Sequence, residues 1–244
     1  MKDKSFFVDT TKCTACRGCQ VACKQWNQLP ATKTRQRGSF QNPEDLNFFT
    51  YKLVRFSEIE ANKTVKWYFF PDQCRHCMNP PCKLRADSLG VKAIIKDEVT
   101  GAVLYNPKVK VKEEDFEKIR KGCPWNIPRW DKTTQGIAKC TMCIDRINEG
   151  LLPACVKTCP SGTMNFGDRD MILNMARKRL KEVKTLYPDA ALLNQRFLRT
   201  IFLVVDKPIK YHKFADAMNS YQRKDFEEKA SETELTKPVH QQNA

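Results

Sequence analysis

The chain has 244 residues, of which 41% are hydrophobic, so it is large and apolar enough to form a core. Its formal net charge of +15 comes from 43 Lys and Arg against 28 Asp and Glu. The basic residues are scattered among acidic ones and no nucleic-acid-binding module accompanies them, so we expect no nucleic acid as a partner.

Neither a transmembrane segment nor an export signal is predicted. The longest apolar run, Ile201–Val205, is far shorter than the roughly 18 residues that a transmembrane helix needs. The first residues, MKDKSFFVDTTKC, contain no apolar stretch and no twin arginine. We therefore expect the protein to be cytoplasmic or to be exported by a partner.

A strand at residues 5–9 is predicted to enter a metal-binding loop. The loop contains Cys13, Cys16, Cys19 and Cys23. Three thiolates at intervals of two residues can converge on one iron–sulfur cube, because the loop bends around it and turns its amides inward. A helix beginning near Gly18 would put Cys19 and Cys23 one turn apart on one face, pointing at different clusters.

The middle of the chain predicts short strands and a second metal-binding loop. We expect strands at 51–57 and 65–70 joined through residues 58–63, and a hairpin at 93–105. Between them stand three cysteines, Cys74, Cys77 and Cys82. A charged segment of helical character ends at Gly122, directly before Cys123 and Pro124.

The last cysteine run closes in the way that two-cluster ferredoxins do. It contains Cys140, Cys143, Cys155 and Cys159, and Pro160 follows. In those ferredoxins the cysteine before the proline ligates the other cluster. Beyond it we expect the ferredoxin hairpin to recur around 163–166, followed by a helix capped by Asp170 and reaching Leu186, and a strand at 200–206. Met171, Met175 and Val183 are expected to form the packing face of that helix.

Zinc is the main alternative to iron–sulfur clusters. The pairs Cys74/Cys77 and Cys140/Cys143 would suit a zinc ribbon, with His76 as a spare ligand. A zinc site has no use for the triple run or for the prolines after the terminal cysteines, so we favour clusters. We expect His76 at the surface or beside the ligands, and we expect most basic residues near the cysteines to be solvated.

Four motifs carry a family resemblance: CTACRGCQVACKQWN, CRHCMNPPC, KGCPWNIPR and KCTMCIDRINEGLLPACVKTCPSG. Over residues 5–167 the chain resembles the ferredoxin-like iron–sulfur subunits of the molybdenum and tungsten pterin oxidoreductases. Such subunits usually hold four [4Fe–4S] clusters with sixteen cysteines, whereas this chain has 12. Ala86-Asp87 stands where a cysteine and proline would follow Cys82, and the charged segment replaces another triple run. The resemblance thus implies that one cluster is lost and three remain.

The resemblance also implies the ligands. Cluster one takes Cys13, Cys16, Cys19 and Cys159; cluster two takes Cys23, Cys140, Cys143 and Cys155; cluster three takes Cys74, Cys77, Cys82 and Cys123.

The implied fold is α+β, with two ferredoxin-like modules and a C-terminal helix and strand extension. Residues 1–44 and 131–170 would form the first module with two clusters, and residues 45–130 a degenerate second module with one. Residues 171–218 would form the extension and residues 219–244 a polar arm.

Within the family, GSFQNPEDL and CIDRINEGLLPACVKTCPSGTMNFGD make the chain most similar to formate dehydrogenase β subunits of the two-subunit kind found in sulfate-reducing bacteria. This implies a non-catalytic electron-transfer subunit. Its partner would be a catalytic α subunit with molybdenum or tungsten on two pterin guanine dinucleotides and its own [4Fe–4S] cluster. Cluster one would face that subunit, and cluster three would face an acceptor such as a cytochrome c, in the periplasm after export with the partner.

Two other functions stay open. The chain could serve another pterin enzyme, such as a polysulfide, thiosulfate or dimethyl sulfoxide reductase. It could also be a zinc-stabilised interaction protein.

Overall fold

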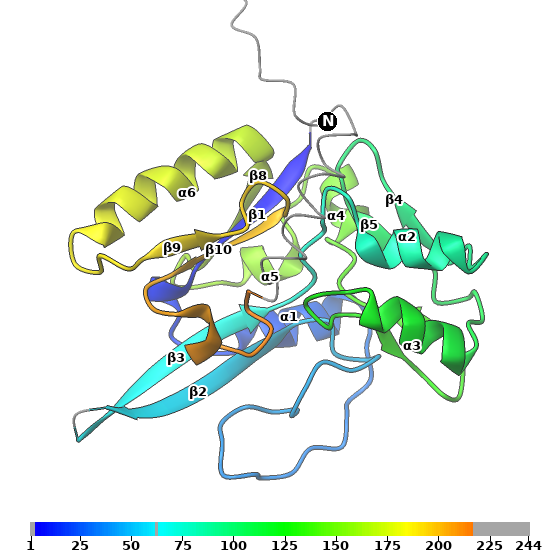
Figure 1. Ribbon diagram of the computed structural model, residues 1–244, viewed down its shortest axis with the longest axis horizontal. Coiled ribbons are helices and arrows are strands. Elements are labelled where there is room, and N and C mark those ends of the chain that lie inside the picture. The colour runs from blue at the N-terminus through cyan, green and yellow to red at the C-terminus, as the bar shows by residue number, and fades with distance from the viewer. Residues whose placement is uncertain (1–2, 62, 217–244) are drawn as a thin grey trace, which may run out of the picture.

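The computed structural model describes residues 3–61 and 63–216, which form a mixed α/β structure (Figure 1). The strands are β1 (Lys4–Asp9), β2 (Leu53–Ala61), β3 (Thr64–Asp72), β4 (Ile94–Lys96), β5 (Val103–Tyr105), β6 (Arg129–Trp130), β7 (Ile137–Ala138), β8 (Met164–Asp168), β9 (Ala191–Leu193) and β10 (Thr200–Val204). The helices are α1 (Gly18–Trp26), α2 (Pro81–Ser88), α3 (Glu113–Lys121), α4 (Ile144–Asn148), α5 (Ala154–Lys157) and α6 (Arg169–Lys184), with 3-10 turns η1 (Thr10–Lys12) and η2 (Pro208–Lys210). The predicted arm, residues 219–244, lies outside the described residues.

A four-stranded sheet in the order β8-β1-β10-β9 joins the two ends of the described chain. β1 runs parallel to β10, with Phe7 opposite Ile201, and antiparallel to β8. Every residue of β10 is buried, as expected for a central strand with both faces covered. The predicted strands near 5–9 and 200–206 are confirmed, whereas β9 was not predicted. The prediction of a hairpin around 163–166 is wrong, because these residues enter the edge strand β8, whose partner is the distant strand β1.

Helix α6 covers one face of this sheet, and of the three residues expected on its packing face only Val183 is buried there. Its buried residues are Ile172, Ala176 and Val183, which pack with apolar side chains of β1 and β10. Met171 is 63% exposed and Met175 is 45% exposed, so their assignment to the packing face is wrong. The turn of the helix places the smaller Ala176 against the sheet and leaves both methionines at its side. The helix also begins at Arg169, so Asp170 lies inside its first turn instead of capping it.

Strands β2 and β3 form a long hairpin that projects from the body (Figure 1). We expected a connection at residues 58–63, but pairing continues to Ala61 opposite Thr64. That prediction is wrong because the alternation of acidic and apolar residues from Glu58 onward suits a two-faced strand, with Ile59 opposite Lys66.

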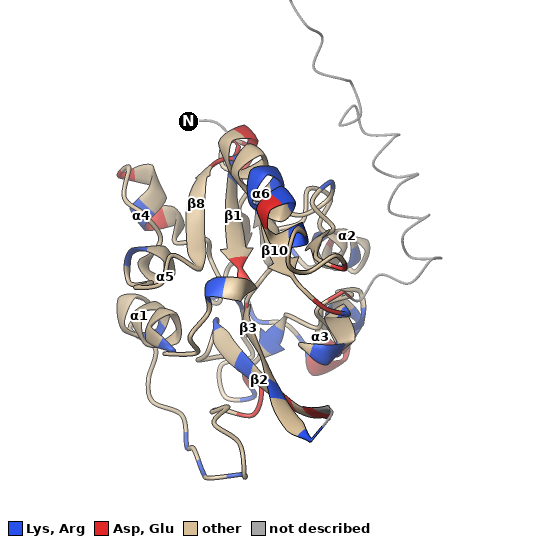
Figure 2. Ribbon diagram, turned by 90° about the vertical axis from the view of Figure 1, so that its left-hand side faces the viewer, with Lys and Arg blue, Asp and Glu red and all other residues tan. Residues whose placement is uncertain are grey.

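The helices near the cysteines form two groups. Helix α1 packs on α5, and helix α2 packs on α3 and on β4. Figure 2 shows α1, α4 and α5 on one side of the central strands and α2 and α3 on the other. Helix α1 begins at Gly18 and α3 ends before Gly122, as expected. Among the described residues, none of the helices is both long enough and apolar enough to cross a bilayer.

Candidate metal centres

The same loop conformation occurs at three of the cysteine pairs. The N–H of His76 donates to Sγ of Cys74 at 3.3 Å, and the N–H of Met142 donates to Sγ of Cys140 at 3.4 Å. In the first loop the N–H of Ala15 makes the matching contact with Cys13 and acts to lower the pKa of that thiol, although burial raises it to about 11. The φ angles of the three donor residues are 55° at Ala15, 44° at His76 and 61° at Met142. The left-handed backbone curls each loop and directs amides toward the thiols, as anion-binding loops do.

The tertiary fold brings together thiols that are far apart in the sequence. The pKa of Cys23 is raised by burial and then by the charges of Cys140, Cys155 and Cys143. The pKa of Cys77 is raised by burial and then by Cys74, Cys123 and Cys82. Cys13 and Cys19 each interact electrostatically with Cys159, and Cys19 interacts with Cys16. The neighbouring thiols therefore form three groups of four. The first group is Cys13, Cys16, Cys19 and Cys159; the second is Cys23, Cys140, Cys143 and Cys155; the third is Cys74, Cys77, Cys82 and Cys123.

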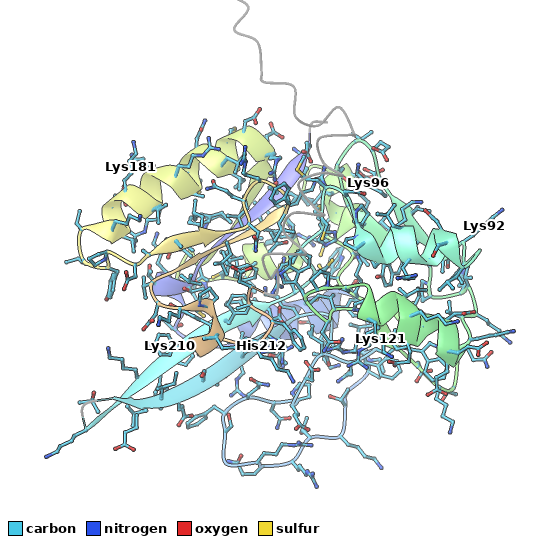
Figure 3. All side chains as sticks on the ribbon, viewed as in Figure 1. Lys92, Lys96, Lys121, Lys181, Lys210 and His212 are labelled. Carbon is cyan, nitrogen blue, oxygen red and sulfur yellow. The ribbon has the colours of Figure 1, made fainter. Side chains whose placement is uncertain are left out.

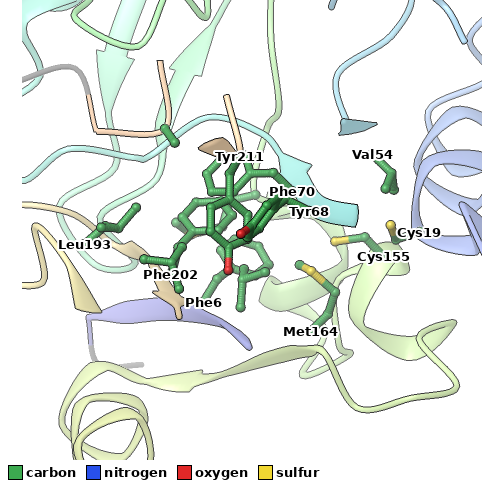
Figure 4. Packing of buried hydrophobic residues seen from close by; sticks show 14 of the residues in the cluster. Phe6, Cys19, Val54, Tyr68, Phe70, Cys155, Met164, Leu193, Phe202 and Tyr211 are labelled. Atoms are coloured by element: carbon green, nitrogen blue, oxygen red, sulfur yellow. The ribbon is translucent and has the colours of Figure 1, made fainter. Parts of the chain in front are cut away.

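Two further contacts give the groups an order. Cys155 interacts with Cys19 of the first group, and Cys140 interacts with Cys74 of the third. The second group therefore lies between the other two. Figure 4 shows Cys19 and Cys155 at the edge of the main apolar cluster, near Val54 and Met164.

The exposure of the cysteines differs among the three groups. Cys16 of the first group is exposed, and Cys13 and Cys159 are half-buried. The thiols of the second group are buried, as are those of the third group except the half-buried Cys123. Burial raises the pKa of Cys123 and of Cys140 to about 12, so these thiols stay protonated near neutral pH unless a metal displaces the proton.

Cys159 differs from the other thiols. Burial acts to raise its pKa, but the N–H groups of Met164 and Thr163 and the contacts of Ser161 outweigh that effect and lower it. The Ser161 hydroxyl lies 3.7 Å from Sγ. The Cys159 thiol therefore loses its proton more readily than an ordinary cysteine thiol.

A cavity in the third group fits an anionic group with sulfur acceptors. All four thiols of the group line it, together with Tyr105, Trp125 and Lys139. Burial raises the pKa of the Cys82 thiol, and the buried Tyr105 hydroxyl faces that thiol and acts to lower its pKa. The Trp125 Nε1 is buried and has no hydrogen-bond partner in the described part of the chain. Buried donors without partners are costly unless a bound group accepts from them. The thiolates of an iron–sulfur cluster and its sulfides provide such acceptors.

Lys52 is a buried cation beside the first and second groups. It is 1% exposed, and its Nζ donates to the Pro71 carbonyl at 3.1 Å and to Gln73 Oε1 at 2.7 Å. Burial acts to lower its pKa, but the charges of Cys19, Cys155, Cys140 and Cys23 raise it. Nothing in the local sequence TYKLVRF signals this burial, because a lysine before a strand is usually solvated.

His76 and Arg75 are more buried than expected. His76 is 0% exposed, its Nδ1 accepts from the N–H of Val103 at 3.1 Å, and burial lowers its pKa well below the usual value. The expectation of a surface position is therefore wrong, and the alternative position beside the cysteines is correct. Arg75 is 1% exposed and pairs with Asp72 at 2.7 Å. In residues 3–61 and 63–216, no three His, Cys, Asp or Glu side chains form a site for a single metal ion.

Comparison with known proteins identifies similar chains. The family described as "4Fe-4S dicluster domain" matches residues 65–169. The chain is 54% identical over 214 residues to the formate dehydrogenase subunit beta of Megalodesulfovibrio gigas, covering 88% of this chain and 99% of the relative. It is 50% identical over 217 residues to formate dehydrogenase 2 subunit beta (cytochrome c-553) of Nitratidesulfovibrio vulgaris, with 88% and 99% covered. The formate dehydrogenase-O iron-sulfur subunit of Escherichia coli is 35% identical over 212 residues, with 84% and 68% covered.

Proposed function

This chain belongs to the family of formate dehydrogenase iron–sulfur (beta) subunits, and from that premise we propose that it relays electrons through three [4Fe–4S] clusters. The electrons come from formate oxidation on a catalytic partner and leave to an external acceptor. The proposed number of clusters rests on the loop that occurs three times, at Cys13, Cys74 and Cys140. In each loop a backbone amide donates to the first thiol of a cysteine pair.

Each cluster would be held by one group of neighbouring thiols. Cluster one would bind Cys13, Cys16, Cys19 and Cys159; cluster two Cys23, Cys140, Cys143 and Cys155; cluster three Cys74, Cys77, Cys82 and Cys123. The packing of α1 on α5 supports the crossed assignment, because each of these helices contributes or adjoins ligands of both the first and second clusters.

The chain's own residues would bind and insulate the clusters. A [4Fe–4S] cluster, when bound, accepts and releases one electron at a time. Buried thiols exclude water from the second and third sites, and amides such as those of His76 and Met142 stabilise negative charge on sulfur. With all 12 thiols assigned, no iron keeps an open position, so substrate chemistry belongs to the catalytic partner.

We propose the domain division expected from the sequence. Residues 1–44 and 131–170 would form the two-cluster module, residues 45–130 the one-cluster module, residues 171–218 the extension and residues 219–244 the arm. The separate apolar cluster around α2, α3, β4 and β5 supports the second module. The extension contributes β9 and β10 to the sheet that contains β1.

The lost cluster would be replaced by side chains. Ala86, at the position of the missing cysteine, is 0% exposed within α2. It belongs to the same apolar cluster as Phe116 and Ile119, the two buried residues of α3. We propose that α3 fills the volume that a fourth cluster takes in longer relatives.

We propose that the first cluster faces the catalytic subunit. The family implies such a partner, and we propose that it carries molybdenum or tungsten on two pterin guanine dinucleotides and one [4Fe–4S] cluster. Support for the orientation comes from Cys16, which is exposed at this end, and from Val21 of α1, which is 62% exposed. An exposed apolar side chain beside a cluster suits contact with a partner.

The third cluster would pass electrons to a cytochrome c. One relative has cytochrome c-553 in its name, and we extend that partner class to this chain. We also propose that the complex acts in the periplasm after export with the catalytic subunit. Fractionation of cells that produce both subunits tests the location, and recovery of this chain with cytoplasmic markers alone would contradict it.

Metal and sulfide analysis of the anaerobically purified complex tests the cluster content. Three clusters correspond to about twelve iron atoms and about twelve acid-labile sulfides per copy of this chain, beyond those of the partner. Zinc without sulfide would instead support the interaction-protein alternative. Formate-dependent reduction of a viologen dye by the same complex tests the substrate, and its absence would favour another pterin enzyme.

A further inference from the structure

Two lysines are buried without a carboxylate partner among the described residues. Lys52 is 1% exposed and Lys139 is 4% exposed. Four buried arginines, Arg55, Arg75, Arg129 and Arg199, do pair with carboxylates. A fifth, Arg146, lies over the Trp26 ring and donates to the Leu152 carbonyl. Other lysines, such as Lys92, Lys121 and Lys181, extend outward from the surface (Figure 3). A buried ammonium without a counter-charge is strongly unfavourable, so these two sites call for an anion nearby.

Lys52 lies at the junction of the first and second thiol groups. The next two residues pack in different clusters: Leu53 lies with Cys74 and Cys140, whereas Val54 lies with Cys19 and Cys155. Burial raises the pKa of Cys19 and of Cys155, and in both thiols the largest opposing effect is the charge of Lys52. Its Nζ is held by Pro71 and Gln73, which fixes the charge in place.

Lys139 lies at the junction of the second and third groups. It directly precedes Cys140, and its Nζ donates to the carbonyls of Cys140, at 3.0 Å, and of Val103. The same Nζ is 4.7 Å from the centre of the Tyr105 ring. Lys139 also lines the cavity that the thiols of the third group surround. One fixed positive charge therefore lies between the first and second thiol groups, and another lies between the second and third.

We propose that Lys52 and Lys139 balance the negative charge of the clusters on either side of them and raise the reduction potentials of those clusters. The proposal depends on the proposed function, since it needs clusters at the three sites. One-electron reduction changes the charge of a cluster and its four thiolates from about −2 to about −3, with the electron supplied by formate oxidation. A nearby fixed cation stabilises the reduced form more and so raises the potential. Because each lysine serves two neighbouring sites, it also reduces the repulsion between two reduced clusters.

Redox titrations followed by electron paramagnetic resonance on the purified complex test the proposal. Lys52→Met is expected to lower the equilibrium constant for reduction of the first and second clusters at least tenfold, which is about 59 mV for one electron. The third cluster should change much less. Lys139→Met should lower the potentials of the second and third clusters and spare the first. Lys52→Arg and Lys139→Arg keep the charge and should restore most of each potential, and Lys181→Met on the outer face of α6 is the matched control.

The outcomes separate the counter-charge from a packing role. Unchanged potentials in both Met variants with full iron content would overturn the proposal. Loss of iron in the Met and the Arg variants alike would make the lysine a packing residue and would also overturn it. Loss of iron in the Met variant with retention in the Arg variant supports the counter-charge, because only the charge is common to Lys and Arg. Absence of iron and sulfide from the unaltered chain would instead refute the proposed function itself.

Discussion

The side-chain amide of Asn27 reaches back to Cys23, donating to its carbonyl oxygen at 2.7 Å and to its Sγ at 3.7 Å. The first contact closes the C-terminal end of α1, and the second places a donor on a proposed ligand of the second cluster. The Asn27 side chain therefore links the end of α1 to the thiol that would bind the proposed second cluster.

Asn27→Ala is expected to lower the potential of the second cluster. Hydrogen bonds to a charged acceptor contribute about 1 kcal/mol or more, which for one electron is roughly 40 mV. Redox titration of the complex measures the shift. Gln25→Ala, at a neighbouring position of α1 whose side chain has no sulfur contact among the described residues, is the control. Equal potentials in the two variants would show that the Asn27 contact has no redox role.

Crossed ligation gives a prediction for cysteine variants. Cys13→Ala and Cys159→Ala are expected to abolish the same paramagnetic signal, although the two residues stand at opposite ends of the cysteine pattern. Cys155→Ala should abolish a different signal, because Cys155 is a proposed ligand of the second cluster. Iron content with spectroscopy of the reduced complex checks this. Loss of one common signal in Cys155→Ala and Cys159→Ala, with another lost in Cys13→Ala, would contradict the crossing.

How far the sequence predicts this molecule depends on the range of the interactions involved. The start of α1 at Gly18 follows from the spacing of Cys19 and Cys23, which is a local constraint. The packing face of α6 does not follow from composition, since the sheet selects Ala176 and leaves Met175 outside. The burial of Lys52 depends on thiols from distant parts of the chain, so a local pattern cannot reveal it.

Two glycines provide a matched test of a close contact. Gly101 and Gly90 have φ angles of 75° and 71°, so alanine is strained at both, by about 1 kcal/mol. A Cβ on Gly101 would lie 1.9 Å from Nε of Arg199, whereas nothing lies within 4 Å of one on Gly90. That Nε donates to Asp3 at 2.6 Å, and Nη1 of the same arginine donates to the Cys77 carbonyl at 3.3 Å.

Gly101→Ala should therefore destabilise the protein by about 2–4 kcal/mol, and Gly90→Ala by about 1 kcal/mol. Anaerobic thermal unfolding followed by circular dichroism gives both values. Similar melting temperatures for the two variants would mean that Arg199 moves aside without loss.

His212 gives a pH dependence with a definite sign. Burial lowers its pKa to about 4, and Arg55 and Arg75 add to that effect while Asp72 opposes it. The unfolded chain binds a proton near pH 6.5, which the folded chain does not bind until about pH 4. The stability contribution is therefore complete above pH 6.5 and is lost as the pH falls toward 4.

Between pH 6.5 and pH 5 this loss amounts to at most about 2 kcal/mol. Denaturant unfolding of the cluster-loaded protein at a series of pH values measures it. His212→Phe removes the titrating group and should flatten part of the slope. The buried His76 would retain its own share, because its pKa is also lowered. An unchanged slope in His212→Phe would show that His212 titrates alike in the folded and unfolded chains.

Ala86 tests whether packing or a missing ligand accounts for the proposed loss of a fourth cluster. The residue is 0% exposed in α2, within the apolar cluster that contains Phe116 and Ile119 of α3. Ala86→Cys places a thiol three residues after Cys82 but leaves α3 in place, so we expect no additional iron. Ala86→Leu overfills the same volume and should destabilise the protein by about 1–3 kcal/mol.

Arg85→Leu, at the exposed neighbouring position of α2, is the control and should change stability by less than about 1 kcal/mol. Iron analysis and thermal unfolding of the three variants provide the measurements. A gain of iron in Ala86→Cys would mean that space for a fourth cluster persists beside α2. Tolerance of Ala86→Leu would point the same way, because an unfilled volume accepts the larger side chain without strain.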